Sequence, residues 1–149
     1  MVDTSVLSKY SLFDGLEQDQ IDNILPMMKL EVFEAGADII VEGTYVGKIR
    51  FILDGKVSVI KEGFVLQELD EGVVFGEMEM VDVDPAEATV RALETTTVMT
   101  LSIDSLGEIY ETDLKAYSFI IMNIARDISR RLRRMNAIAI KESPAMEWN

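Results

Sequence analysis

The sequence contains neither cysteine nor histidine. Without cysteine, the chain can form no disulfide, no thiolate metal site and no thiol nucleophile. Histidine is the commonest general base and metal ligand, so its absence removes the usual chemistry of catalytic triads, zinc hydrolases and metal-dependent cupins. We therefore expect a protein that is not an enzyme and holds no metal.

Long apolar runs are also missing, and none approaches the roughly 20 residues that a membrane-spanning helix needs. The segment Met1 to Lys9 lacks the basic and apolar regions of a secretory signal. We expect a cytoplasmic protein without a membrane partner. The length of 149 residues, with 48% apolar residues, suits one packed globular domain.

The net charge of −13 is unevenly distributed along the chain. Residues 1–113 hold 7 basic and 24 acidic groups, whereas residues 114–149 hold 7 basic and 3 acidic groups. An acidic body repels nucleic acid, because phosphate neutralisation supplies most non-specific affinity. We expect no DNA partner, although the basic end could contact an anionic partner such as the acidic face of a second copy.

Hydrophobic periodicity divides the chain into three zones and a tail. Residues 1–29 form a helical segment, in which Ile21, Ile24, Leu25 and Met28 have the spacing of a buried helix face. Residues 30–103 contain short β-rich runs separated by glycines, which is typical of an antiparallel roll or sandwich. Asp54-Gly55 predicts a two-residue hairpin within this zone. The strands are expected at 30–33, 38–41, 48–53, 56–60, 64–69, 88–93 and 97–103.

The third zone, residues 104–141, returns to helical spacing. Asp104 or Ser105 can cap a short helix through Tyr110, and a long helix follows from about Asp113 to Lys141. Residues 142–149 are expected to be a frayed tail. The long helix carries an apolar stripe opposite a basic cluster, for which we expect a solvated face. The stripe comprises Tyr117, Ile121, Ile124, Ile128, Leu132, Met135 and Ile138, and the cluster comprises Arg130, Arg131, Arg133 and Arg134.

Five segments have a family resemblance: LFDGL (12–16), FEAGADIIVEG (33–43), FILDGKVSV (51–59), FGEMEMVDVDPAEATVRAL (75–93) and IARDISRRLR (124–133). Their order resembles the cyclic-nucleotide-binding domain family of bacterial catabolite regulators and kinase regulatory subunits. The resemblance implies one domain over residues 1–149. Its fold would be mainly β, an antiparallel double-stranded β-helix or jelly roll with an N-terminal helix and a long C-terminal helix.

The resemblance places the family's phosphate-binding cassette at residues 75–93. In the family, the glutamate that matches Glu77 binds the ribose hydroxyl, and an arginine just after the proline contacts the cyclic phosphate. Here Pro85 is followed by Ala86 and then Glu87, so that the arginine is missing and an acid stands beside the gap. Glu79 also stands where a small residue is usual. The implied site, now degenerate, comprises Phe75, Gly76, Glu77, Met78, Ala86, Glu87, Ala88 and Thr89.

Physical chemistry supports the frame of this cassette. Gly76 would let the backbone approach a ligand closely, and a short helix beginning near Glu77 would direct N–H groups at an anion. Arg91 is an alternative phosphate contact, whose direction depends on which face of its strand is buried. The acidic residues of this region could bind a divalent cation, but a solvated acidic loop is the simpler interpretation. They are Glu77, Glu79, Asp82, Asp84 and Glu87.

Together these features predict a ligand-sensing or protein-interaction module that uses no cofactor and does not bind cAMP or cGMP tightly. We expect output through an unidentified protein partner and a homodimer formed by the C-terminal helix. One alternative is a cyclic-nucleotide sensor with a non-standard phosphate contact, and another is a carboxylate-based, cupin-like enzyme. A helix folded back on its own barrel is the rival to the dimer. The residues predicted at the dimer interface are Ile121, Ile124, Ile128, Leu132 and Met135.

Overall fold

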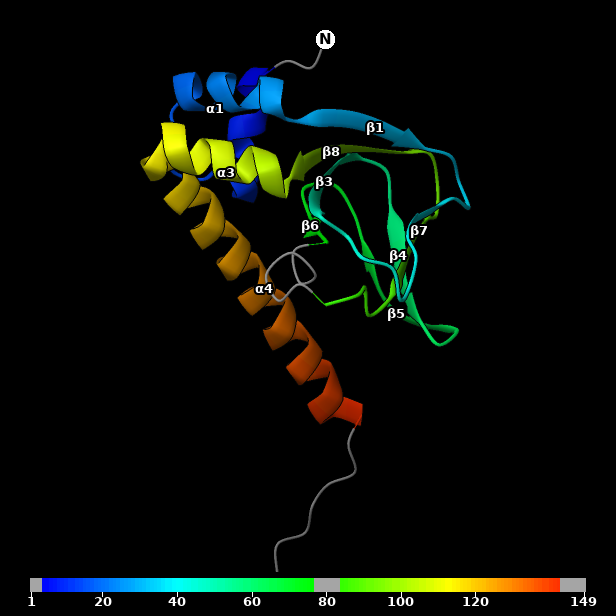
Figure 1. Ribbon diagram of the computed structural model, residues 1–149. Helices are drawn as coiled ribbons and strands as arrows, with labels where there is room; N and C mark the ends of the chain where they lie inside the picture. Colours follow the sequence, from blue (N-terminus) through cyan, green and yellow to red (C-terminus); the bar gives the residue numbers. More distant parts are fainter. Residues whose placement is uncertain (1–3, 77–83, 143–149) are drawn as a thin grey trace, which may run out of the picture.

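A computed structural model describes residues 4–76 and 84–142, which form two four-stranded antiparallel sheets flanked by helices (Figure 1). The helix-side sheet has the order β1 (Lys29–Phe33), β8 (Thr96–Ser102), β3 (Lys48–Asp54) and β6 (Val74–Phe75). The outer sheet has the order β2 (Asp38–Ile40), β7 (Thr89–Ala92), β4 (Val57–Lys61) and β5 (Phe64–Leu69). The expected antiparallel β architecture is confirmed, and the jelly-roll winding stays a prediction. Strand β6 was not expected, because two residues are too short to show an alternating pattern.

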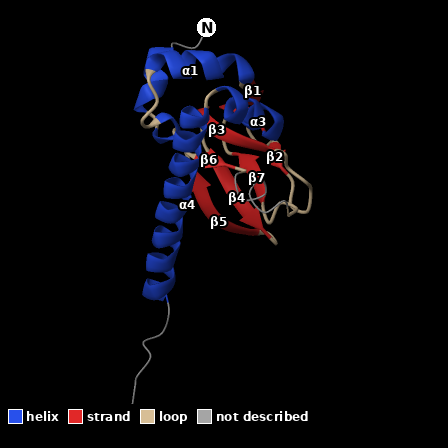
Figure 2. Ribbon diagram, turned by 60° about the vertical axis from the view of Figure 1, so that its left-hand side comes forward, coloured by secondary structure: helices blue, strands red, loops and turns tan. Residues whose placement is uncertain are grey.

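Helices begin and end the described chain. The N-terminal segment holds the 3₁₀ turns η1 (Thr4–Lys9) and η2 (Ser11–Phe13), helix α1 (Gln18–Ile24) and the 3₁₀ turn η3 (Leu25–Met27). The C-terminal segment holds α3 (Ile103–Thr112) and the 29-residue α4 (Leu114–Glu142). Helices and strands occupy separate parts of the molecule, and α4 runs alongside the strands (Figure 2). None of the helices in the described ranges has a stretch long and apolar enough to cross a bilayer.

Two helix boundaries differ from expectation. The predicted helical face through Met28 is interrupted, because α1 ends at Ile24 and Pro26 lies in the first turn of η3. Proline cannot donate the backbone hydrogen bond that a continuing α-helix requires. Helix α3 is capped by Ser102, whose hydroxyl accepts from the Ser105 N–H at 3.1 Å, and not by Asp104 or Ser105.

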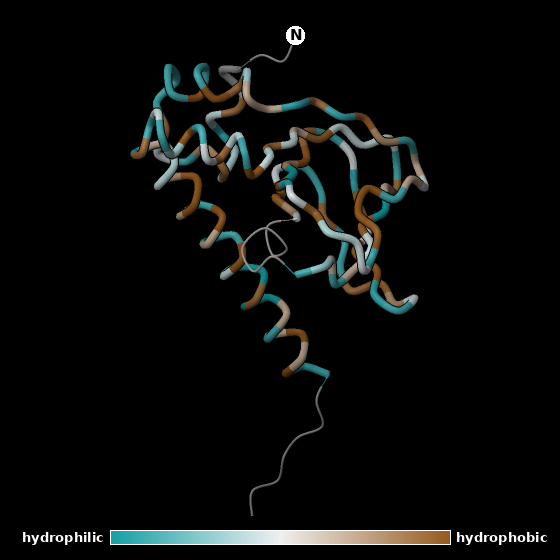
Figure 3. The backbone as a smooth tube through the Cα atoms, viewed as in Figure 1, coloured by the Kyte–Doolittle hydropathy of each residue, from teal (hydrophilic) through white to brown (hydrophobic). Residues whose placement is uncertain are grey.

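The helix-side sheet separates two hydrophobic cores. Successive strand residues point to opposite faces, so Phe51 faces the helices while Ile52 faces the outer sheet. On β8, Met99 and Val98 divide in the same way. The helix-side core continues into α4, along which apolar and polar positions alternate (Figure 3). The molecule is therefore layered as helices, helix-side sheet and outer sheet.

The predicted hairpin at Asp54-Gly55 is wrong. Strand β3 pairs with β6 and β8, whereas β4 pairs with β5 and β7, so the chain passes from one sheet to the other at this point. Gly55 has a φ of +107°, and a Cβ there would lie 2.7 Å from Thr96 Cα and 2.8 Å from the Thr95 carbonyl oxygen. The glycine is needed for this close crossing. The tight hairpin lies instead between β4 and β5, where Glu62 and Gly63 both have positive φ.

Helix α4 is held against the N-terminal segment by Asn123, which is 4% exposed. Its Nδ2 donates to the carbonyl oxygens of Leu12 and Asp14, each at 2.9 Å. The start of α4 is fixed separately by Asp113, whose carboxylate accepts from the Ala116 N–H at 3.0 Å and from Gln20 Nε2 at 3.1 Å. These bonds, the one from Ala116 foremost, hold the pKa of Asp113 below its usual value. The N-terminal half of α4 therefore has a fixed position on the domain.

The sheet crossing predicts that Gly55→Ala is more damaging than Gly63→Ala. Both positions have positive φ, for which a side chain costs about 1–2 kcal/mol. At Gly55 the added Cβ would also crowd neighbouring backbone, which should cost about 1–3 kcal/mol more. At Gly63 the added Cβ meets nothing within 4 Å, so this second cost is absent there. Chemical denaturation of both variants measures the difference. Equal losses of stability would argue against the tight crossing.

The bond network of Asn123 predicts that Asn123→Ala lowers the free energy of unfolding by about 1–3 kcal/mol, because two backbone carbonyls lose their donor. Asn136→Ala is the matched control, since Asn136 is exposed on the same helix and its loss should change stability by less than about 0.5 kcal/mol. Thermal and denaturant unfolding test both variants. The proposed attachment of α4 does not hold if the two substitutions have the same effect.

Candidate functional site

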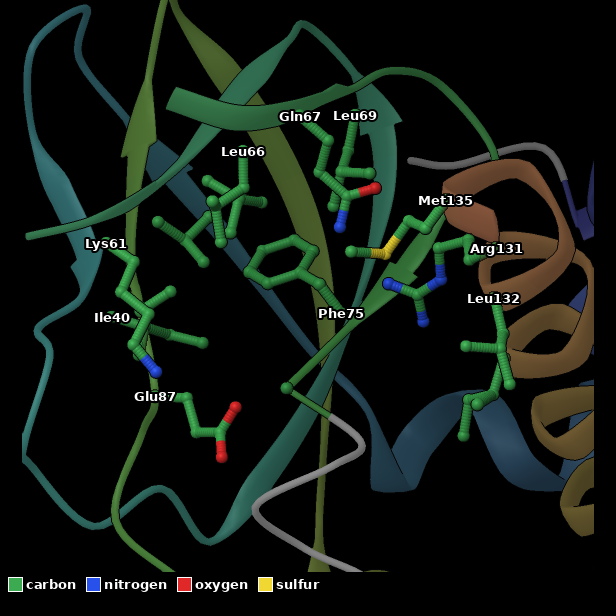
Figure 4. Close-up of a pocket in the computed structure, with 15 residues that line it drawn as sticks. Ile40, Lys61, Leu66, Gln67, Leu69, Phe75, Glu87, Arg131, Leu132 and Met135 are labelled. Atoms are coloured by element: carbon green, nitrogen blue, oxygen red, sulfur yellow. The ribbon is translucent and has the colours of Figure 1, made fainter. Parts of the chain in front are cut away.

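A cavity of about 450 Å³ lies between the β-strands and the C-terminal half of α4 (Figure 4). Its volume is within the range of small-molecule sites, which is roughly 300–1,000 Å³. The outer sheet supplies one wall, the end of β6 supplies the floor, and α4 supplies the opposite wall. The lining residues are Ile40, Val59, Lys61, Leu66, Gln67, Leu69, Phe75, Gly76, Glu87, Ala88, Val90, Ile128, Arg131, Leu132 and Met135.

The lining is mostly apolar on both walls. Phe75 is 2% exposed and lies near the centre of the close-up, between the strand residues and α4 (Figure 4). Leu66 and Leu69 come from β5, while Leu132 and Met135 approach from the helix. Such a lining favours a ligand with a substantial apolar body, with specificity coming from the few polar groups.

Those polar groups occupy two sides of the cavity (Figure 4). Arg131 enters from α4, whereas Lys61 and Glu87 lie on the side away from the helix. The cation on the helix side is therefore separated from a pair of opposite charges on the cassette side.

Arg131 forms an ion pair with Asp127, one turn earlier on α4. Its Nη2 lies 3.3 Å from Asp127 Oδ2, and each side chain is only 12% exposed. The expected solvated face is therefore wrong for Arg131, although Arg130, Arg133 and Arg134 are exposed. The sequence does contain a signal for this difference, since Arg131 alone in the cluster has an acid four residues before it.

The predicted cassette residues are only partly brought together. Phe75, Gly76, Glu87 and Ala88 line the cavity, whereas Glu77 and Met78 lie outside the described residues. Ala86 is 3% exposed within the core between the sheets and does not line the cavity. Its N–H donates to the Thr44 carbonyl and its own carbonyl accepts from the Gly43 N–H, both at 2.8 Å.

Thr89 also turns away from the cavity, and its Oγ1 accepts a hydrogen bond from the Glu42 N–H at 3.0 Å. Gly76 does line the cavity, but a ligand is not needed to explain the glycine. Its φ is +84°, and a Cβ there would lie 2.8 Å from the Lys48 carbonyl oxygen. The neighbouring strand β3 therefore already requires glycine at this position.

Arg91 does not replace the missing cassette arginine. It lies on the face of β7 opposite Val90 and Ala92, which are buried in the core, and it is absent from the cavity lining. Its Nε donates to Asp38 Oδ1 at 2.7 Å on the molecular surface. This bond lowers the pKa of Asp38 and raises that of Arg91.

A second buried guanidinium, that of Arg50, is also separate from the cavity lining. It is 8% exposed, and its Nε has no hydrogen-bond partner among the described residues. Burial lowers the pKa of Arg50, an effect that the Coulomb attraction of Glu31 partly offsets. Glu31 in turn accepts a hydrogen bond from Thr100 at 2.6 Å, so this group belongs to the packing of β1, β3 and β8.

The predicted dimer stripe of α4 is not one free surface. Ile124 is 3% exposed in the domain's own core, so its assignment to a dimer interface is wrong. Ile128 is half-buried against that core, and its place at a dimer interface stays a prediction. Leu132 and Met135 line the cavity while remaining 56% and 47% exposed, and Ile121 is 36% exposed. Helical spacing alone could not separate residues that pack on the same chain from residues left for a partner.

Within residues 4–76 and 84–142, no group of three or more acidic side chains is placed to hold a metal ion. Three of the five acids considered for such a site, namely Glu77, Glu79 and Asp82, lie outside those ranges. The described part of the site therefore offers an apolar cavity with separated charges.

The chain is similar in sequence to known proteins. A profile of the family described as cyclic nucleotide-binding domain matches residues 30–113. The mouse potassium/sodium hyperpolarization-activated cyclic nucleotide-gated channel 2 is 33% identical over 106 residues, which are 71% of this chain and 12% of the channel. The chain thus spans only a small part of that relative's length.

Solved structures share the fold. A cyclic nucleotide-binding domain from Methylobacillus flagellatus KT superposes with a TM-score of 0.86 at 21% identity, covering 97% of this chain and 84% of that one. The Thermus thermophilus catabolite activator protein superposes with a TM-score of 0.73 at 24% identity, covering 85% and 60% of the respective chains. At these identities the likeness establishes the fold alone.

Proposed function

This chain belongs to the cyclic nucleotide-binding domain family, and we propose that it is a non-enzymatic ligand-sensing or protein-interaction module that does not bind cAMP or cGMP tightly. The observation that supports this proposal most directly is the negative charge of Glu87 on the side of the cavity that faces away from α4. The position after Pro85 is a buried alanine, and the next residue, Glu87, presents a carboxylate to the cavity.

A cyclic nucleotide brings one negative charge that must be matched inside the cavity. A charge-assisted hydrogen bond of the kind that an arginine makes to phosphate contributes about 1.5–3 kcal/mol, which corresponds to about 10- to 100-fold in affinity. Glu87 adds repulsion, because like charges interact more strongly near a low-dielectric protein surface than in water. Arg91 gives no compensation, since it is bound to Asp38 on the outer face.

A functional cyclic-nucleotide sensor with a non-standard phosphate contact is the second candidate. The observation in its favour is Arg131, a cation that reaches the cavity from α4. For this contact the phosphate would have to bind on the helix side, away from the backbone of the cassette. The two candidates make opposite predictions for nucleotide affinity.

Output through another protein is part of the proposal. The relatives include a channel and an activator protein by name, and the matched domain is a minor part of the channel. A homodimer through α4 is also proposed, on a narrower surface than the sequence suggested. Leu114, Ile121 and Leu132 are separated by 7 and 11 residues, so they lie along one side of the helix, and they are 36–56% exposed.

We predict no binding of cAMP or cGMP to the wild-type chain at micromolar concentration, as measured by calorimetry. The variant Glu87→Arg should gain affinity, because Glu87 lines the cavity and the change replaces the repelling acid with a cation. Arg91→Gln is the control, and it should leave nucleotide affinity unchanged. Micromolar affinity in the wild-type protein would reject the main proposal and support the second candidate.

The dimer proposal predicts that Ile121→Glu produces monomers of undiminished thermal stability, because the side chain is exposed and a carboxylate opposes apolar association. Ile124→Glu is the contrasting variant and should unfold the domain, since it buries an unpaired charge in the core. Sedimentation velocity at micromolar concentration separates dimer from monomer. A wild-type monomer under these conditions would end the proposal.

A further inference from the structure

The polar groups of the cavity indicate the class of ligand that it accepts. Arg131 is the charged group on the helix wall, and Gln67 lines the same cavity from β5 (Figure 4). Between this pair and the opposite side, the cavity is bounded by Phe75 and by the leucines of β5. An acidic group at Arg131 would therefore place the rest of a ligand against apolar side chains.

Asp127 forms an ion pair with this arginine at 3.3 Å. It is 8% exposed, it does not line the cavity, and it pairs with Arg131 from within the helix. A guanidinium has several N–H donors in one plane, so it can donate hydrogen bonds to a second carboxylate in addition to the first. Asp127 thus pairs with Arg131 without itself lining the cavity.

The opposite side of the cavity does not attract an anion in the same way. Lys61 and Glu87 both line that side, so an anion there would meet a carboxylate as well as an ammonium group (Figure 4). A molecule with one acidic group is therefore oriented, with the acid toward α4 and its body toward Phe75. A phosphate held in the family's usual place would instead meet Glu87.

We infer that the cavity binds organic carboxylic acids with an apolar body, and that their carboxylate is held by Arg131. The inference rests on the proposed function, which leaves the nucleotide pocket free for another ligand. The apolar body would gain affinity from water exclusion, and the carboxylate from a charge-assisted, bidentate contact. A bound ligand would then contact α4 through Arg131 and the β-strands through its apolar body.

Calorimetry with decanoate and naphthoate on the full chain tests the inference, with decanol as the uncharged counterpart of decanoate. The two acids should bind, and decanol should bind more weakly than decanoate. Asp127→Asn removes the helix carboxylate but keeps Arg131, so acid affinity should be retained or increased. Adding Arg131→Gln to that variant should lower acid affinity by about 10- to 100-fold and leave decanol affinity unchanged.

Comparing the single with the double variant isolates Arg131, because neither protein carries an unpaired carboxylate at position 127. Arg134→Gln, an exposed substitution on the same helix, should have no effect. The inference is overturned if neither acid binds the wild-type chain, or if loss of Arg131 leaves acid affinity unchanged. A parallel titration with cAMP separates the two proposals. Absence of both acid and cAMP binding contradicts this inference alone, whereas micromolar cAMP binding contradicts the proposed function.

Discussion

The attachment of α4 to its own domain determines the shape of the site. Ala116, Ile120 and Ile124 are buried in the helix-side core, and Asn123 binds two carbonyls of the N-terminal segment. This anchors the first half of a 29-residue helix, so its second half must continue alongside the outer sheet. The cavity exists because that second half forms its wall. Without the anchor, Leu132 and Met135 would have no defined distance from Phe75.

The same geometry sets how charges are distributed around the cavity. Glu87 lines one side of it, while Arg131, paired with Asp127, lines the helix side. Backbone constraints such as Gly76 against Lys48 act without a ligand. Binding specificity can change under such conditions without loss of the fold, because the side chains that choose the ligand are not those that hold the sheets.

Sequence reasoning located the strands and the long helix, because alternating and helical periods are local properties of the chain. It failed where the outcome depended on which segments meet. Asp54-Gly55 has the composition of a hairpin, yet its strands enter different sheets. Ile124 and Ile121 belong to one apolar stripe, yet only Ile124 packs into the core. Among the site residues, Phe75, Gly76, Glu87 and Ala88 followed from the family resemblance, whereas the contribution of Arg131 required the position of α4.

The position of α4 over the strands can be measured directly, because the chain has no cysteine and accepts engineered labels at chosen sites. Spin labels at Glu68→Cys on β5 and Asn136→Cys on α4 report the width of the cavity mouth by pulsed electron resonance. Dilution with excess unlabelled protein removes distances between copies. The account predicts one narrow distance distribution in the ligand-free chain, unchanged by millimolar cAMP. A broad distribution without ligand, or a shift when cAMP is added, would contradict it.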